Sequence, residues 1–266
     1  RATARIPVPD SMLDAAAVSV AGGRRDNQDS GCAGSRLIAV ADGVGGHAGG
    51  AIASALAIRW LTRQPYQSPG GGAAALARAV AGAGSSIRLA GRHAPELAGM
   101  ATTLTAVVLD GGVAVVGHLG DSRAYLARSG RLSRLTADQT WVQTLVDAGI
   151  ITAEQARTHP MRSVLTHCLH GAFEDLTHLR LLPVAVRPGD RLLVSSDGLH
   201  DVLALGLIGR ILADETTPAA AASALVSAAL ASGTPDSATA VVADVVGVTG
   251  DGAARARPAV LVGAAA

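Results

Sequence analysis

The sequence contains no lysine, so its 22 basic residues other than histidine are all arginines. A phosphate-binding loop of the Walker type needs a lysine, so its absence excludes that class of nucleotide site. Aromatic residues make up only 2% of the chain, which leaves alanine, valine, leucine and isoleucine to fill the core. The two cysteines, Cys32 and Cys168, lie far apart and form no CxxC motif. They predict neither a disulfide framework nor a zinc site, and they fit a reducing compartment.

An excess of charge of one sign is also missing, because 22 arginines balance 21 acidic residues to a formal net charge of +1. Scattered arginines on a near-neutral chain predict no binding to nucleic acid or to an anionic membrane. The longest apolar stretch, residues 219–231, is too short and too interrupted by serine to span a bilayer. Residues 1–14 contain no apolar leader, so we expect a cytoplasmic protein with no membrane span.

With 266 residues, 49% of them hydrophobic, the chain can bury the core of one large domain. Apolar and alternating runs predict strands over residues 18–20, 36–41, 104–109, 113–119, 123–127, 131–135, 179–186, 190–195 and 238–246, with a polar segment at 22–30. Helical spacing predicts helices over residues 73–92, 138–148, 152–158 and 218–231, and one more with Ile52, Leu56 and Trp60 as its apolar stripe. Residues 110–112 (DGG) and 128–130 (RSG) indicate hairpins. We therefore predict an α+β fold in which helices cover antiparallel sheets.

Aspartates beside small or polar residues recur at strand ends, in residues 27–29 (NQD), 41–43 (ADG), 120–122 (GDS) and 196–198 (SDG), and again at Asp236. Carboxylate oxygens are the ligands that Mg²⁺ and Mn²⁺ prefer, and small neighbours let a backbone carbonyl approach the ion. A single Asp-Gly pair is more often an ordinary turn. Two such pairs that each end an apolar strand, with further aspartates elsewhere, predict a metal site.

Four segments, in this order, carry a resemblance to a known family: residues 24–29 (RRDNQD), 40–47 (VADGVGGH), 120–123 (GDSR) and 196–199 (SDGL). They resemble the motifs of the PP2C-like (PPM family) bacterial metal-dependent protein serine/threonine phosphatases. Residues 135–138 (LTAD), 145–149 (LVDAG) and 159–166 (HPMRSVLT) are similar to the flap of the bacterial members. The resemblance runs from about residue 17 to residue 246.

The resemblance implies a four-layer α-β-β-α sandwich, in which two stacked antiparallel sheets are flanked by antiparallel helix pairs. It implies a lead-in over residues 1–14, a phosphatase domain over residues 15–248 with a flap at about residues 138–172, and a loose tail over residues 249–266. The strands and helices predicted from spacing agree with this fold but do not by themselves lead to it.

The resemblance also implies a set of metal ligands. Asp42 would bridge two ions, Mn²⁺ or Mg²⁺, and the Gly43 carbonyl would bind the second of them. Asp197 and Asp236 would complete the coordination of the first ion. Asp121, together with Asp197, would hold a third and weaker ion.

Arg24 and Asp29 are the other catalytic residues that the resemblance implies. The planar guanidinium of Arg24 suits two oxygens of a substrate phosphate, and Asp29 would orient metal-bound water. A water shared by two divalent ions loses a proton near neutral pH, and the hydroxide would attack phosphorus in line. The expected activity is hydrolysis of phosphoserine and phosphothreonine in proteins, with a serine/threonine kinase or its substrates among the partners.

Four positions depart from the usual motifs: Gln28, Val44, Gln139 and Ser237. Gln28 replaces a common glutamate, and its amide can still hydrogen-bond a metal-bound water. Val44 stands where eukaryotic members have a histidine, the proposed general acid, so leaving-group protonation falls to water or another group, with His47 a weaker candidate. Gln139 stands where the flap often has histidine, and Ser237 replaces an asparagine.

Two other classes of function compete with this hypothesis. A docking module with the same fold and no catalysis is weakly favoured by the changes at Gln28 and Ser237, whereas the intact aspartates and Arg24 favour an enzyme. A metal titration separates the two. The glycine-rich stretch at residues 43–50 could indicate an unrelated metal hydrolase or a nucleotide-binding protein, but no GxGxxG pattern opens a helix there.

Overall fold

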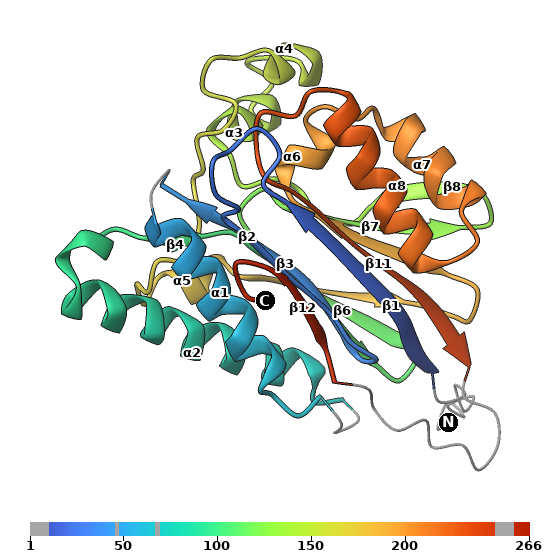
Figure 1. Ribbon diagram of the computed structural model, residues 1–266, viewed down its shortest axis with the longest axis horizontal. Helices are drawn as coiled ribbons and strands as arrows, with labels where there is room; N and C mark the ends of the chain where they lie inside the picture. Colours follow the sequence, from blue (N-terminus) through green and yellow to red (C-terminus); the bar gives the residue numbers. More distant parts are fainter. Residues whose placement is uncertain (1–10, 46–47, 67–69, 248–257) are drawn as a thin grey trace.

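The computed structural model describes residues 11–45, 48–66, 70–247 and 258–266, and contains two antiparallel sheets (Figure 1). The five-stranded sheet has the order β1-β11-β10-β7-β8, formed by Ser11–Val20, Ala238–Gly247, Arg191–Ser195, Arg123–Arg128 and Arg131–Arg134. The seven-stranded sheet has the order β12-β2-β3-β5-β6-β9, formed by Val260–Gly263, Asp29–Ala33, Leu37–Val44, Leu104–Asp110, Val113–Leu119 and Arg180–Ala185. Its remaining strand, β4 (Ala101–Thr102), pairs with the end of β3. Both predicted hairpins, β5–β6 and β7–β8, are confirmed.

Helices cover the outer face of each sheet (Figure 1). α1 (Ala48–Thr62) and α2 (Gly72–His93) lie against the seven-stranded sheet, and α7 (Leu205–Asp214) and α8 (Pro218–Ala231) lie against the five-stranded sheet. The short helices are α3 (Trp141–Asp147), α4 (Ala153–Arg157), α5 (Asp175–His178), α6 (Asp197–His200) and the 3₁₀ turn η1 (Pro95–Leu97). The four-layer sandwich implied by the resemblance is therefore confirmed. Within the described residues, no helix has both the length and the apolar character needed to cross a bilayer.

Three apolar layers hold the four structural layers together. Between the sheets, the layer contains β-branched side chains such as Ile38, Val107 and Val241, all fully buried. Such side chains pack well on the pleated surface of a sheet. The layers beneath the helices are rich in alanine, as the shortage of aromatic residues requires.

The apolar stripe predicted for α1 is not the face of the helix that is buried most deeply. Ile52 is 37% exposed, and Leu56 and Trp60 are only partly buried. Ala53 and Ile58 are fully buried and face the sheet. The contact of this helix with the sheet is made largely by alanine, so the large side chains of the predicted stripe lie to one side of that contact.

Three strands differ from the prediction. β1 begins at Ser11 and pairs with β11 along its whole length, so residues 11–14 are not a lead-in. β2 lies partly in the segment predicted as polar, because its polar groups are buried with partners from other segments of the chain. Residues 260–263, predicted within a loose tail, form β12 against β2; residues 249–257 of that tail lie outside the described residues.

The start of one helix also differs from the prediction, and one turn connects the two sheets. The helix predicted over residues 138–148 begins at Trp141, because the Thr140 side chain accepts a hydrogen bond from the Gln143 N–H and caps it. The turn at residues 187–189 joins strands of different sheets, since β9 pairs with β6 whereas β10 pairs with β7 and β11. The chain crosses from one sheet to the other at this turn.

Candidate metal centre

Strands from both sheets bring the predicted aspartates to one region of the molecule. Asp29 begins β2 and lies opposite Asp42 of β3 in the sheet register. Asp197 opens α6 after β10, Asp236 lies just before β11, and Asp121 lies between β6 and β7. Each of these groups alters the pKa of at least one other member of the set, Asp42 through a side-chain hydrogen bond and the other four through their charge. The five carboxylates are therefore neighbours, although they are far apart in the sequence.

The backbone around Asp42 is fixed from several sides. The Asp42 N–H donates to Thr103 Oγ1 at 3.0 Å, and the Asp42 carbonyl accepts from the Thr103 N–H at 2.8 Å and from the Thr102 hydroxyl at 2.9 Å. A Cβ at Gly43 would lie 2.3 Å from the carbonyl of Gly50 in α1. Only glycine permits this approach of α1 to β3, so the helix fixes the chain next to the central carboxylate.

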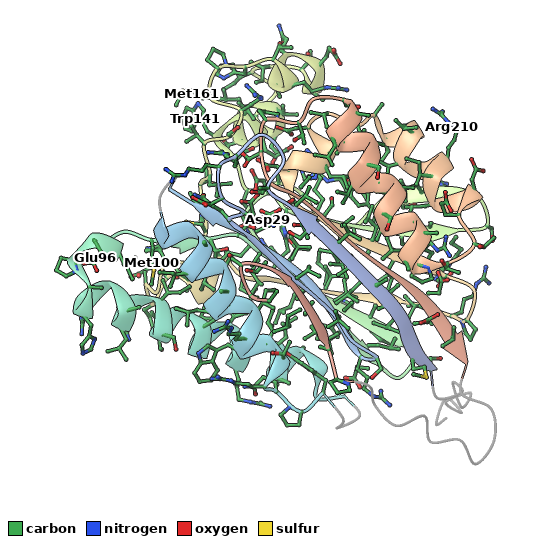
Figure 2. The ribbon with its side chains drawn as sticks, viewed as in Figure 1. Asp29, Glu96, Met100, Trp141, Met161 and Arg210 are labelled. Atoms are coloured by element: carbon green, nitrogen blue, oxygen red, sulfur yellow. The ribbon has the colours of Figure 1, made fainter. Side chains whose placement is uncertain are left out.

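Asp29, labelled in Figure 2, is fully buried. One hydroxyl group just after β10 and one in β11 hold its carboxylate. Ser196 Oγ donates to Asp29 Oδ2 at 2.7 Å, and Thr239 Oγ1 donates to the same oxygen at 2.6 Å. The Asp29 N–H donates to Asn27 Oδ1 at 3.0 Å. The other carboxylate oxygen, Oδ1, is buried without a hydrogen-bond partner. A buried carboxylate oxygen in this condition is suited to accept a hydrogen bond from water or to face a cation.

Burial and mutual repulsion raise the pKa values of the clustered carboxylates. Burial raises the pKa of Asp42, and the charges of Asp29, Asp197 and Asp121 raise it further. The pKa of Asp197 is raised by burial and then by the charge of Asp201. Carboxylates this close to one another cannot all ionise unless protons or cations compensate for their charge.

The donor set fits hard divalent cations. Oδ1 of Asp197, like Oδ1 of Asp29, is buried without a hydrogen-bond partner. In the described part of the chain, no three acidic, histidine or cysteine side chains converge on one point that could hold an ion. Mg²⁺ usually keeps several waters when carboxylates of a protein bind it. The aspartates therefore suit ions that are held by carboxylates and completed by water, rather than an ion enclosed by side chains.

Arg24, predicted to bind phosphate, is paired with Asp236, predicted to bind metal. Arg24 Nε lies 2.7 Å from Asp236 Oδ1, and Nη2 lies 2.5 Å from Oδ2. This hydrogen bond raises the pKa of Arg24, and the charges of Asp42 and Asp197 add to the effect. The pair uses two of the five guanidinium N–H groups, and the Arg24 side chain is 46% exposed. The structure thus places Arg24 and Asp236 in direct contact with each other.

Two of the departures from the usual motifs join segments of the site. The Gln28 N–H donates to Ser237 Oγ at 3.2 Å, and the Gln28 carbonyl accepts from the Gly43 N–H at 3.2 Å. The Ser237 hydroxyl therefore links the first motif to the last, as a capping group would. Val44 ends β3, and His47 lies outside the described residues.

Gln139 attaches the flap to the acidic cluster. Its side-chain carbonyl accepts from the Gly120 N–H and its own N–H donates to the Gly120 carbonyl, both at 2.8 Å. Gln139 Nε2 donates to the His178 carbonyl at 3.0 Å, and the Thr166 N–H donates to the Gln139 carbonyl at 2.8 Å. Because Gly120 directly precedes Asp121, this one glutamine connects the flap, α5 and a predicted metal ligand.

Sequence reasoning missed two parts of the site. No role was predicted for the hydroxyls of Ser196 and Thr239, although a buried hydroxyl in an apolar strand often marks a buried polar partner. Asp201 was also missed, and it lies close enough to Asp197 to raise its pKa. Arg162 of the flap pairs with Asp201, with 3.9 Å between Nε and Oδ2. The sequence signal for this group is an aspartate four residues after Asp197.

Two stacked antiparallel sheets between helix pairs, with aspartates of both sheets gathered at one site, define the fold class of the metal-dependent protein phosphatases. The family model "Protein phosphatase 2C" matches residues 24–232. The chain belongs to this family.

Named relatives agree with that assignment. The chain is 45% identical to serine/threonine protein phosphatase PstP of Mycobacterium tuberculosis over 226 residues, which are 84% of this chain and 43% of that protein. A crystal structure of the PstP catalytic domain in complex with two manganese ions has a TM-score of 0.81 and 42% identity, covering 89% of this chain and 99% of the other. PppA, a regulatory component of the type VI secretion system in Pseudomonas aeruginosa, has a TM-score of 0.77 and 31% identity, covering 89% and 100%. The chain thus spans less than half of full-length PstP but matches almost all of its solved catalytic domain.

Proposed function

We propose that this chain is a metal-dependent protein serine/threonine phosphatase that hydrolyses phosphoserine and phosphothreonine. The observation that carries the proposal is the gathering of five carboxylates and one arginine at a single site: Asp29, Asp42, Asp121, Asp197, Asp236 and Arg24. Membership of the protein phosphatase 2C family and the manganese ions of the related catalytic domain support it.

The carboxylates would hold two ions of Mn²⁺ or Mg²⁺. Asp42, which neighbours Asp197 and Asp121, would be shared by both ions, and the Gly43 carbonyl would bind the second. Asp197 and Asp236 would bind the first ion, and Asp121 with Asp197 would bind a weaker third. When bound, such ions lower the pKa of water and neutralise negative charge on phosphoryl oxygens.

The remaining residues would orient the reactants. Two hydroxyl donors fix Oδ2 of Asp29, so its Oδ1 is available to orient the attacking water. Arg24 would bind two phosphate oxygens with the N–H groups that Asp236 does not use. Because Asp236 already holds the guanidinium, the direction of these donors is set before substrate arrives.

A cysteine nucleophile does not enter this mechanism. Burial raises the pKa of Cys32 to about 12 and that of Cys168 to about 11. Neither residue supplies a thiolate near neutral pH, so direct attack by water remains. With valine at position 44, protonation of the leaving group would fall to water or to another group.

Phosphoproteins are the expected substrates, and a serine/threonine kinase or its substrates are the expected partners. The flap exposes large apolar side chains on its surface: Trp141 (43% exposed), Ile150 (68%), Met161 (44%) and Val164 (44%). Exposed apolar groups of this size favour contact with a polypeptide over contact with a small phosphate ester.

The test is phosphate release from a phosphothreonine peptide during titration with Mn²⁺ or Mg²⁺. The matched control is the same peptide carrying phosphotyrosine. We expect release from phosphothreonine that rises with metal, stops on addition of EDTA, and exceeds release from phosphotyrosine. If the wild-type chain released no phosphate at any metal concentration, the proposal would be wrong, and a non-catalytic docking module would be the better hypothesis.

A further inference from the structure

The segment 258–266 runs beside the strand that carries Asp29. β12 pairs antiparallel with β2, from Val260 opposite Ala33 to Gly263 opposite Ser30. The next N–H, that of Ala264, donates to the Asp29 carbonyl at 2.8 Å. Figure 1 shows β12 in dark red beside β2, at the edge of the seven-stranded sheet. β12 therefore ends its pairing at the residue that we expect to orient water.

The contact between Gly263 and Asp29 leaves no room for a side chain at position 263. Gly263 has a φ of +72°, and a Cβ placed there would lie 2.1 Å from the Asp29 carbonyl oxygen and 2.9 Å from Ser19 Oγ. Ser19 Oγ lies 2.7 Å from Thr239 Oγ1, and Thr239 donates to the Asp29 carboxylate. Gly263 thus packs against the main chain of Asp29 and against Ser19, whose hydroxyl is bonded to the Thr239 hydroxyl that supports the Asp29 side chain.

The presence of β12 also keeps β2 from being an edge strand of the sheet. All five residues of β2 are buried, and in the sheet order β12 is the neighbour on the side away from β3. Without β12, the N–H and C=O groups on that side would face water, and Asp29 would begin an exposed edge strand. Covering β2 keeps the Asp29 carboxylate dry and its backbone fixed.

The segment 258–266 packs into only one of the three apolar layers described above. Ala265 is 2% exposed in the layer beneath α1 and α2, and Leu261 packs against the same layer. Among the described residues, the other two apolar layers contain none after Val245. Loss of β12 should therefore affect β2 and its surroundings while the two sheets stay packed together.

We propose that the segment 258–266 is a positioning element for the catalytic site, which holds Asp29 in register by closing the edge of β2. This inference rests on the proposed function, because it assigns to the segment the task of placing a residue of that site. Displacing β12 would then reduce metal affinity and turnover without unfolding the domain.

The experiment compares Gly263→Ala with Gly130→Ala in the full chain. Both glycines have positive φ, +72° and +76°, but no heavy atom lies within 4 Å of a Cβ at Gly130, in the β7–β8 hairpin. The two variants share the strain of a positive φ, and only the first pushes on Asp29. Mn²⁺ affinity is measured by calorimetry, kcat and KM are measured with a phosphothreonine peptide, and hydrogen exchange is followed over residues 29–33.

For Gly263→Ala we expect Mn²⁺ affinity and kcat each to fall by about 10-fold or more, as for other residues that support metal-site groups. KM should stay near the wild-type value, raised Mn²⁺ should restore part of kcat, and residues 29–33 should exchange faster. Gly130→Ala should match the wild type in all four. Leu261→Ala, which loosens β12 without backbone strain, should shift affinity and exchange in the same direction, and it carries the test if Gly263→Ala does not fold.

Three results would overturn the inference. One is wild-type Mn²⁺ affinity in Gly263→Ala, whether or not exchange over residues 29–33 has increased. The second is an equal loss in Gly130→Ala, and the third is an unchanged affinity in Leu261→Ala with β12 released. A wild-type chain without phosphatase activity would refute the proposed function instead, and the affinity comparison would still test the positioning of Asp29.

Discussion

The carboxylate of Asp29 is held by hydroxyl groups 167 and 210 residues away in the sequence, from Ser196 and Thr239. Both donate to the same oxygen, and both are themselves buried. Burial nevertheless raises the pKa of Asp29 to about 6, because the hydroxyls only partly replace the lost water. At the residue scale, the site depends on these neutral donors as well as on its charges.

Thr239→Val should therefore destabilise the folded protein. The substitution keeps the shape of the side chain and removes one donor, which should lower the free energy of unfolding by about 1–3 kcal/mol. Urea unfolding in EDTA measures the change, and Thr62→Val, whose hydroxyl donates only to the Arg59 carbonyl in its own helix, is the control. Equal stability of Thr239→Val and the wild type would show that the hydroxyl does not support Asp29.

His118 should make stability depend on pH. Its Nε2 lies 2.9 Å from the Ala137 carbonyl oxygen, and burial lowers its pKa from 6.5 to about 4. As the pH falls, the unfolded chain binds the proton first, so the contribution of His118 is fully present above pH 6.5. Between pH 6.5 and pH 4 it is lost, by about 3 kcal/mol in total.

Unfolding by urea at pH 7 and pH 4.5, in EDTA, measures this effect against His118→Asn. The aspartate cluster contributes with the opposite sign, since its raised pKa values mean that protonation favours the folded state. Both proteins contain the cluster, so only the difference between them reports on His118. The wild type should lose more stability than the variant on acidification, and parallel losses would contradict the assignment.

At the scale of elements, several residues tie the flap to the rest of the domain, and Gln139 does so directly beside Asp121. Gln139→Ala removes the bonds to the Gly120 N–H and to the His178 carbonyl. With the loop of Asp121 released, we expect kcat to fall by about 10-fold and the weakest Mn²⁺ site to weaken further. Gln143→Ala, which breaks an exposed bond to Asp147 within α3, is the matched control. Equal kinetics for the two variants would mean that the flap does not position Asp121.

Elements with a strong local signal were predictable, and elements defined by tertiary contacts were not. The α8 helix, with Pro218 at its first turn and Thr217 as its cap, has the predicted bounds. β2 contains the buried polar residues Asp29 and Ser30, so its sequence is as polar as that of a loop and does not indicate a buried strand. β12 is four residues long, and its pairing with β2 depends on a partner more than 200 residues away.

The same distinction holds for the site. Motif spacing singled out Asp42, Asp197 and the other carboxylates because each motif is local. The pairing of Arg24 with Asp236 joins residues 212 positions apart, and no local pattern predicts it. The contact between Gly263 and Asp29 is of the same kind.

For the whole molecule, metal binding should be coupled to stability, because the ions would neutralise carboxylates that otherwise repel one another in a buried site. Mn²⁺ at 100 times its Kd should add about 2.7 kcal/mol to the free energy of unfolding. For a domain of this size, that corresponds to a rise in Tm of about 5–10 °C. Thermal unfolding across a Mn²⁺ titration measures it, EDTA should reverse it, and an unchanged Tm would argue against ions at the cluster.

The central claim is that the aspartate cluster is a metal centre that hydrolyses phosphate esters, and Asp42→Asn tests it most directly. The variant keeps the shape of the side chain and removes the charge at the centre of the cluster, while Asp14→Asn, at an exposed position of β1, is the control. Phosphate release from a phosphothreonine peptide and Mn²⁺ affinity should both be lost in Asp42→Asn and kept in Asp14→Asn. In EDTA, Asp42→Asn should be more stable than the wild type, because one repelling buried charge is gone. Wild-type turnover in Asp42→Asn would contradict the account.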